Sequence, residues 1–124
     1  MYSPIVLIGP MAAGKSTIAN LLAAELNMER FGVDEHRWDY YKAQGYDFDE
    51  GKAIYEAGGS KALLQYWKPY EAGTVVKMLK DHPNTVMDFG AGHSVYEDEA
   101  LFAKVESALR DLPNVVLLLP SPDL

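Results

Sequence analysis

A short segment near the start of the sequence has the residue types and the spacing of a phosphate-binding loop. Residues 9–17 read Gly-Pro-Met-Ala-Ala-Gly-Lys-Ser-Thr and match the pattern G-x-x-x-x-G-K-[ST]. Successive backbone N–H groups of such a loop point inward, and the dipole of a following helix adds positive potential at the same place. The pattern therefore predicts that this segment binds the phosphate groups of a nucleotide.

The side chains of this loop have distinct expected roles. We expect the Lys15 ammonium to reach the β- and γ-phosphates, the Ser16 hydroxyl to bind Mg²⁺, and Thr17 to add a phosphate contact. At two positions glycine allows a close backbone approach that a Cβ would obstruct. The predicted nucleotide-binding residues are Gly9, Met11, Ala12, Ala13, Gly14, Lys15, Ser16 and Thr17.

The elements on either side of the loop support this interpretation. Residues 5–8, Ile-Val-Leu-Ile, form a short apolar run that is typical of a strand buried on both faces of a parallel sheet. From about Gly14 onward, apolar residues recur at helical spacing until Asn27, the expected stop. The predicted apolar stripe of this helix consists of Ile18, Leu21, Leu22 and Leu26, with alanines filling between them.

Strand-like and helix-like segments alternate along the rest of the chain. The further expected strands are residues 30–33, 85–89 and 115–119. Residues 50–80 read as a helix broken or kinked near Pro69 and Gly73, and Ser94 with Glu97 resembles a capping box before a last helix that ends at Pro113. This alternation predicts an α/β fold in which helices cover both faces of a parallel sheet.

Polar residues follow the expected strands at their carboxyl ends, where ligands bind in sheets of this kind. Asp34 follows the second strand, and Asp88 lies at the end of the third, directly before Phe89 and the turn Gly90-Ala91-Gly92-His93. A carboxylate that ends an apolar strand beside a phosphate-binding loop is typical of the residue that holds Mg²⁺ through water. Asp88 is therefore the expected acidic partner of Ser16 at a magnesium ion.

Composition limits the class of protein. The 124 residues, 48% of them hydrophobic, suffice for one domain, and the lack of cysteine excludes a disulfide framework. A net charge of −7 without a Lys/Arg cluster argues against a general nucleic-acid surface. No stretch approaches the ~18 apolar residues of a membrane span, and no basic region precedes an apolar one at the N-terminus. We expect a cytoplasmic protein with neither nucleic acid nor membrane as a partner.

These segments together resemble shikimate kinase and its relatives among the small P-loop kinases. The resemblance rests on residues 9–18, Leu26-Asn27-Met28, Val33-Asp34 and residues 90–95. It implies a three-layer α/β/α fold whose parallel sheet has the strand order 2-3-1-4, without the final strand of the family. It also implies that ATP and Mg²⁺ are bound and that the γ-phosphoryl group moves to a hydroxyl of a small metabolite.

The resemblance assigns roles to particular residues. Where the family has a D-x-D pair, this chain has Gly32-Val33-Asp34, so Asp34 would bind the acceptor hydroxyl and Asp88 would substitute for the missing metal-side Asp. Lys68 stands where the family has an arginine that binds the substrate carboxylate, but lysine lacks the bidentate fork. The catalytic residues implied are Lys15 and Asp34, and the substrate-binding residues are Asp34, Trp38, Lys68, Gly90, Ala91 and Gly92.

The sequence ends at Leu124, soon after the fourth expected strand, whereas the family continues into an arginine-bearing lid, a fifth strand and an adenine-contacting loop. We therefore expect residues 1–124 to be a single truncated kinase domain that binds nucleotide but turns over slowly by itself. An open edge beside the fourth strand predicts self-association.

Two other classes of function remain open from the sequence. A P-loop NTPase or nucleotide-dependent switch would hydrolyse nucleotide without an acceptor, and a non-catalytic nucleotide-binding fragment would bind it without turnover. All three alternatives share the phosphate-binding loop and differ in the fate of the bound nucleotide.

Overall fold

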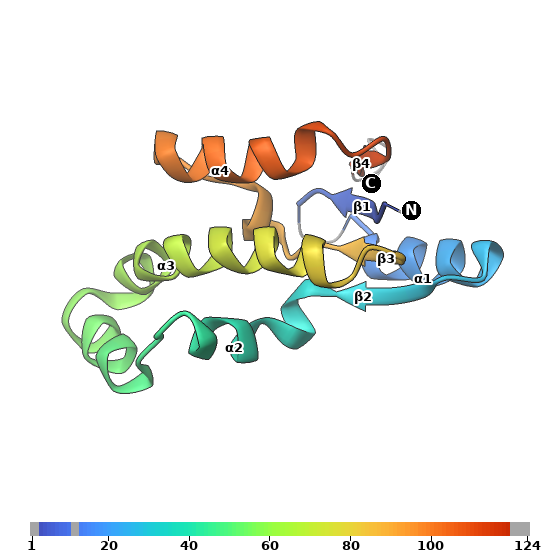
Figure 1. Ribbon diagram of the computed structural model, residues 1–124. Coiled ribbons are helices and arrows are strands. Elements are labelled where there is room, and N and C mark those ends of the chain that lie inside the picture. The colour runs from blue at the N-terminus through green and yellow to red at the C-terminus, as the bar shows by residue number, and fades with distance from the viewer. Residues whose placement is uncertain (1–2, 11–12, 120–124) are drawn as a thin grey trace.

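The computed structural model describes residues 3–10 and 13–119 of the chain (Figure 1). In chain order the elements are β1 (Ile5–Ile8), α1 (Lys15–Leu26), β2 (Glu29–Gly32), α2 (Val33–Ala43), α3 (Phe48–Asp81), β3 (Thr85–Asp88), the 3₁₀ turn η1 (Ala91–Ser94), α4 (Glu99–Arg110) and β4 (Val115–Leu117). All four strands are short and lie within a few residues of their predicted bounds. Among the described helices, none is both long and apolar enough to cross a membrane.

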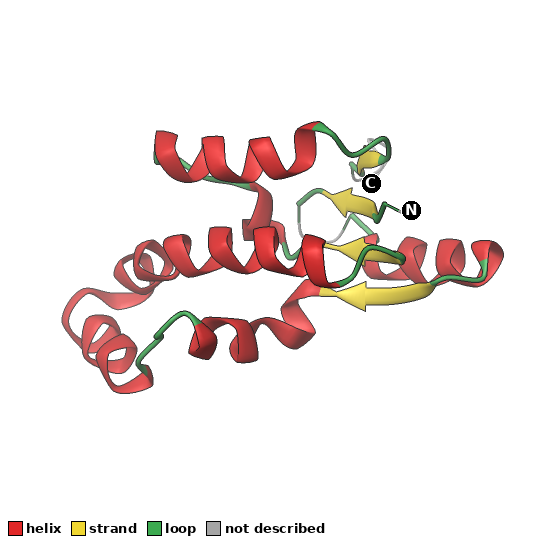
Figure 2. Cartoon of the chain, in the orientation of Figure 1, coloured by secondary structure: helices red, strands yellow, loops and turns green. Residues whose placement is uncertain are grey.

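The four strands form one parallel sheet with the order β2-β3-β1-β4, which confirms the predicted fold. Val6 of β1 pairs with Met87 of β3, and the next residue, Leu7, pairs with Asp88. Because successive side chains of a strand point to opposite faces, each strand contributes to both sides of the sheet. All strands point the same way, so their carboxyl ends meet at one edge, beside the phosphate-binding loop (Figure 2).

Two apolar cores lie on opposite faces of the sheet. On one face, Val6, Phe31 and Met87 pack against the C-terminal part of α3 and against α4. On the other face, Leu7 and Val86 pack against α1. The sheet is thus the middle of three layers, as the alternation of strands and helices predicted.

The predicted apolar stripe of α1 is partly buried at Leu22 alone, which packs against the core, although the bounds of the helix and its Asn27 stop are confirmed. The buried residues of α1 are Ala19 and Ala23, whereas Ile18, Leu21 and Leu26 are exposed, Leu21 by 64%. Alanines allow the helix axis to approach the sheet closely, so the small side chains face the core. Of the larger side chains, Leu22 packs beside these alanines, and the other three remain exposed.

Two expected features of the later helices are also wrong. The non-helical residue of α3 is Gly59 (φ 76°, ψ −166°), and the helix passes through Pro69 without a break. This helix begins directly after Asp47, whose carboxylate accepts N–H bonds from the first turn. Helix α4 is capped by Asp98, which accepts a hydrogen bond from the Leu101 N–H, rather than by a Ser94–Glu97 capping box. Ser94 instead ends η1.

Candidate active site

A cavity of about 320 Å³ lies at the carboxyl ends of the strands, next to the first turn of α1. The residues that line it are Ala13, Gly14, Lys15, Ser16, Arg30, Gly32, Asp34, Glu35, Asp88, Phe89, Gly90 and Ala91. The cavity therefore joins the phosphate-binding loop, the end of β2 and the end of β3, which are far apart in the sequence. Most of the predicted site residues meet here.

The described part of the phosphate-binding loop has the backbone that a phosphate cradle requires. Gly14 adopts a left-handed conformation (φ 82°) directly before α1, where only glycine is free of steric cost. The Lys15 ammonium donates to the carbonyl oxygens of Gly9 and Pro10, at 2.7 Å each, and so lies across the loop. When a phosphate binds, the Lys15 ammonium would exchange these carbonyl oxygens for phosphate oxygens, which are charged and therefore stronger acceptors.

The remaining predicted loop residues differ in where they lie. Ser16 lines the cavity, and Thr17 is exposed in the first turn of α1. Met11 and Ala12 lie outside the described residues. At the far side of the loop, a Cβ on Gly9 would collide with the backbone of Leu118, so glycine is needed where the loop leaves β1.

Asp88 is paired with an arginine that the sequence patterns had not connected to it. Arg30 Nε and Nη2 donate to Asp88 Oδ1 and Oδ2, both at 2.8 Å, and Arg30 Nη1 donates to Glu35 Oε1 at 2.6 Å. Asp88 is 8% exposed, so this bidentate pair is largely removed from water. The side-chain hydrogen bond to Asp88, ahead of the one to Glu35, raises the pKa of Arg30 well above its usual value.

Asp34 lies against the glycine turn that follows β3. Its carboxylate fills the place where a Cβ on Gly90 would be, and its side chain is 58% exposed. Arg37 Nη1 is 3.8 Å from Asp34 Oδ1, and His93 Nδ1 is 3.6 Å from the same oxygen. Asp34 is therefore an accessible carboxylate at the cavity wall, flanked by a cation and an imidazole.

His93 is buried without a hydrogen-bond partner on either ring nitrogen among the described residues; it is 2% exposed. Burial lowers the pKa of His93, against the opposing effects of the Glu71 and Asp34 carboxylates. Burial therefore favours the neutral form of this ring beside Asp34. The sequence had placed His93 in the glycine turn but had not fixed its direction.

Lys68 is held by the protein itself. Its ammonium donates to Glu71 Oε2 at 2.9 Å and to the carbonyl oxygens of Gly92 and Val95 at 2.8 Å each. An ammonium has three donors, and these three acceptors use all of them. In this structure Lys68 therefore ties α3 to the segment around η1, and it can reach a substrate carboxylate only by giving up one of these bonds.

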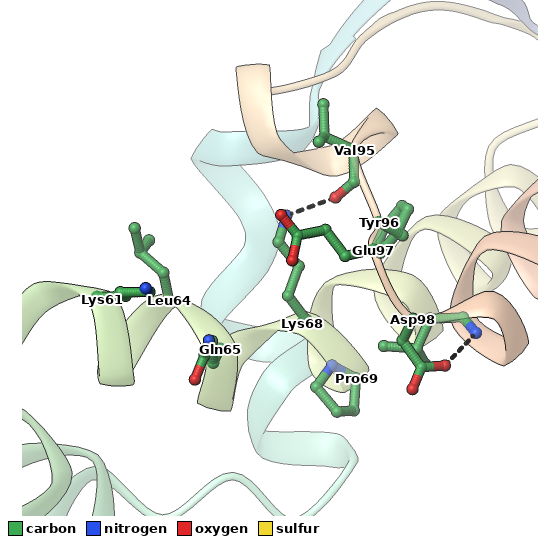
Figure 3. Close-up of a pocket in the computed structure, with 10 residues that line it drawn as sticks. Lys61, Leu64, Gln65, Lys68, Pro69, Val95, Tyr96, Glu97 and Asp98 are labelled. Atoms are coloured by element: carbon green, nitrogen blue, oxygen red, sulfur yellow. Dashed lines mark hydrogen bonds between the residues drawn. The ribbon is translucent and has the colours of Figure 1, made fainter. Parts of the chain in front are cut away.

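A second cavity, of about 460 Å³, is lined in part by this lysine (Figure 3). It lies between α3 and the segment that leads into α4, and its lining includes Leu64, Lys68, Val95 and Tyr96. It is larger than the cavity at the strand ends, but it contains no residue of the phosphate-binding loop. We therefore place the chemistry in the smaller cavity.

Trp38 belongs to an aromatic cluster between α2 and α3. Its ring lies edge-on to Trp67 at 5.7 Å and contacts Tyr41 and Phe48, at 5.2 and 5.4 Å between ring centroids. The Arg37 guanidinium lies over the Trp38 ring at 4.6 Å. Trp38 is not among the described residues that line the cavity at the strand ends, and it contacts that site only through Arg37, whose Nη1 is 3.8 Å from Asp34 Oδ1.

The donor set of the cavity suits a hard cation only in part. The Ser16 hydroxyl and the Asp88 carboxylate are oxygen donors, as Mg²⁺ prefers. Within residues 3–10 and 13–119, however, no three acidic, histidine or cysteine side chains converge in a ready-made metal site. A magnesium ion would therefore need the oxygens of a bound nucleotide to complete its coordination.

Known proteins that resemble this chain in sequence and in structure include shikimate kinases. The chain is 32% identical to the shikimate kinase of Aquifex aeolicus over 116 residues, which is 92% of this chain and 62% of that protein. The solved structure of shikimate kinase from Acinetobacter baumannii in complex with shikimate covers 98% of the chain at a TM-score of 0.63 and 23% identity. The chain has a shikimate kinase-like fold.

Further comparisons define how far this likeness extends. The crystal structure of the Aquifex aeolicus enzyme superposes over 97% of the chain at a TM-score of 0.58 and 27% identity. A 30-residue segment is 67% identical to the shikimate kinase of Chromohalobacter salexigens. The chain spans about three fifths of the length of the first of these relatives, 62%, and 58% of the Acinetobacter structure. No family model matches it.

The shikimate kinase-like fold brings in residues that the sequence patterns missed. Arg30, Glu35, Arg37 and His93 surround the predicted carboxylates, and none of them had been assigned a role. The available signal was strand periodicity, because Arg30 lies two residues before Gly32 and so on the same face of β2. Recognising the pair with Asp88 also required the register between β2 and β3.

Proposed function

We propose that this chain carries the nucleotide and acceptor sites of an ATP-dependent phosphotransferase that acts on a hydroxyl of a small metabolite. The observation that carries the proposal is the single cavity in which Lys15 and Ser16 face Asp34 and Asp88. Phosphate-binding groups and an acceptor-orienting carboxylate are thereby within one space. Phosphoryl transfer depends mainly on such positioning and on charge stabilisation.

The nucleotide side of the site has a clear division of roles. In our proposal, backbone N–H groups of residues 9–17 bind the phosphate oxygens, and Lys15 leaves the Gly9 and Pro10 carbonyls to contact the β- and γ-phosphates. Gly14 supplies the turn that aims these groups at the ligand. The dipole at the start of α1 adds to the attraction.

Ser16 and Asp88 would hold Mg²⁺, the hydroxyl directly and the carboxylate through water. When bound, this ion would neutralise part of the phosphate charge and polarise the γ-phosphoryl group. The charges of the cavity support this part of the proposal. Three carboxylates and two cations line it, so the described side chains alone do not offset the negative charge of a triphosphate.

The acceptor would be a small hydroxylated molecule, with shikimate the first candidate because the similar Acinetobacter enzyme was solved with it. Asp34 would accept a hydrogen bond from the reacting hydroxyl and orient its oxygen toward the γ-phosphorus. As the new P–O bond forms, the bond to the β-phosphate oxygen breaks, ADP leaves, and the hydroxyl proton passes to Asp34 or to solvent. The turn at Gly90, Ala91 and Gly92, with Trp38 and Lys68 behind it, would shape the acceptor side.

Replacing Lys15 by Ala tests the nucleotide site. We expect ATP affinity, measured by isothermal titration calorimetry, to fall by at least about tenfold, because a charged phosphate contact is lost. Lys104→Ala is the matched control, since Lys104 is exposed on α4 and is not among the described residues that line the cavity. Equal ATP affinity of wild type and Lys15→Ala would refute the proposal.

A coupled ADP-release assay with ATP and a panel of hydroxylated metabolites tests the reaction. ADP formation that requires one of these acceptors supports the kinase. Acceptor-independent ADP formation would instead indicate an NTPase, and binding without turnover would indicate a nucleotide-binding fragment.

We also propose that the open edge of β4 supports self-association. Beyond the pairing with β1, the strand has no neighbour among the described residues, and Val116 and Leu117 are exposed on it. An unpaired edge of this kind can add a strand from another chain. Light scattering across a concentration series measures the oligomeric state, and a monomer at all concentrations would contradict this point.

A further inference from the structure

The space beside Asp88 is filled by an arginine because the neighbouring strand has a glycine at its end. Gly32 is paired with Asp88 in the register of β2 and β3, and Arg30 lies on the same face of β2, two residues earlier. The Arg30 side chain passes over Gly32 to reach Asp88. A Cβ on Gly32 would lie 2.8 Å from Arg30 Nη2 and 3.0 Å from the Glu35 carboxyl carbon, so any larger residue would displace this arrangement.

The resulting pair occupies both oxygens of the carboxylate proposed as a metal-side ligand. Arg30 donates two N–H bonds to Asp88, at 2.8 Å each, and such a charged bidentate pair is stronger than a neutral hydrogen bond. Glu35 holds the guanidinium from a third side. A divalent cation next to Asp88 would therefore meet a fixed positive charge within a few ångströms, and the two cations repel each other.

The same guanidinium also faces the nucleotide side of the cavity. Arg30 lines it together with Lys15 and Ser16. Three of its five N–H donors bind Asp88 and Glu35, which leaves two without a partner among the described residues. These donors suit a phosphate oxygen.

We propose that Arg30 and a divalent metal ion compete for Asp88. This inference rests on the function proposed above and adds a residue to it. Without metal, Arg30 binds Asp88 and offers its remaining donors to the nucleotide phosphates. A metal ion that Asp88 holds through water needs the carboxylate oxygens that Arg30 occupies, so the Arg30–Asp88 pair must open, and Arg30 thereby lowers the dependence of nucleotide binding on Mg²⁺.

The test compares ATP affinity with Mg²⁺ and with EDTA in the full chain. The quantity measured is the ratio of the two dissociation constants, without metal over with metal, by isothermal titration calorimetry. In Arg30→Met this ratio should rise by about tenfold or more relative to wild type, because metal gains a free carboxylate and metal-free ATP loses a cation. Arg110→Met is the matched control, since among the described residues Arg110 pairs with Glu106 alone, on α4, and its ratio should equal that of wild type.

A second variant and a second probe keep the test decisive if Arg30→Met does not fold. Arg30→Lys preserves the charge but not the bidentate fork, so it should shift the ratio in the same direction by a smaller factor. Mn²⁺ alone should broaden the amide NMR signals of Phe89 and Gly90 at lower concentration in either variant than in wild type. An unchanged ratio together with unchanged Mn²⁺ broadening would overturn the inference.

The Mn²⁺ titration also separates this inference from the proposed function. If Lys15→Ala binds ATP as tightly as wild type does, the nucleotide site is wrong, yet Mn²⁺ still reports whether Arg30 excludes metal from Asp88. If Lys15→Ala loses ATP while the Arg30 variants behave as wild type, the nucleotide site stands and the competition is refuted.

Discussion

Replacing Gly90 by Ala isolates the contact that holds Asp34 at the cavity. A Cβ on Gly90 would collide with the Asp34 carboxylate, and the three heavy atoms nearest to that Cβ all belong to Asp34. The backbone at Gly90 (φ −63°, ψ 157°) is one that alanine adopts freely, so the substitution brings no backbone strain. The perturbation is therefore a displacement of one carboxylate by about the size of a methyl group.

The geometry predicts a large loss of function with little loss of stability. The Asp34 side chain is 58% exposed and can rotate into solvent, so the free energy of unfolding should change by less than about 1 kcal/mol. A misplacement of about 1 Å at a reacting centre costs on the order of 10²-fold in rate. We expect kcat/KM for the acceptor to fall by about 10²-fold, with the ATP dissociation constant unchanged.

The assay is a double-mutant cycle with Asp34→Ala. Initial rates with ATP and the best acceptor of the panel are measured for wild type, both single variants and the double variant, together with thermal unfolding. If Gly90→Ala acts through Asp34, it should have almost no further effect in the Asp34→Ala background. The same fold loss in both backgrounds, or a parallel loss of ATP affinity, would show that the reasoning is wrong.

Three further predictions concern neighbouring residues. Asp88→Asn should weaken ATP binding with Mg²⁺ much more than binding in EDTA, and equal weakening would remove Asp88 from the metal site. Burial lowers the pKa of His93 in the folded state, so as the pH falls below about 6.5 the histidine takes up a proton in the unfolded chain first. The free energy of unfolding therefore decreases as the pH falls through this range. Chemical denaturation at pH 7.5 and at pH 5 measures this decrease. The decrease in the free energy of unfolding should be smaller in His93→Gln than in wild type, by at most ~1.4 kcal/mol per pH unit, and equal decreases would contradict the prediction. Lys68→Met should lower the free energy of unfolding by about 2–3 kcal/mol, because it leaves the buried Glu71 carboxylate unpaired. Urea denaturation measures this change. A change below ~0.5 kcal/mol, which is typical of surface positions, would contradict the prediction.

Local patterns predicted the elements better than they predicted which faces are buried. The bounds of α1 followed from apolar spacing and the Asn27 stop, yet its buried side chains are alanines, because the distance between helix and sheet decides which residues fit. The break in α3 was expected at Pro69 and lies at Gly59. Proline removes a single N–H donor, which a long packed helix can tolerate, whereas the backbone at Gly59 adopts an angle that other residues rarely reach.

The N-cap of α4 shows a similar limit. Ser94 and Glu97 have the spacing of a capping box, but the chain first forms η1 and then starts the helix after Asp98. Tyr96 is buried between these segments, with its hydroxyl donating to the His93 carbonyl. The helix therefore starts beyond the predicted cap, after a segment whose Tyr96 packs into the core.

For the site, the sequence by itself determined the phosphate-binding loop, the carboxylates at the strand ends and the parallel sheet that brings them together. The loop follows from a short-range pattern, and the parallel direction of the strands follows from the helices that connect them along the sequence. Only the tertiary structure decided which charges meet. Arg30 and Asp88 are separated by 58 positions, and their pairing follows from the register of two strands and from the missing side chain at Gly32. The energy of an electrostatic interaction decreases with the distance between the charges. The register of the two strands therefore determines whether Asp88 faces a metal ion or a guanidinium.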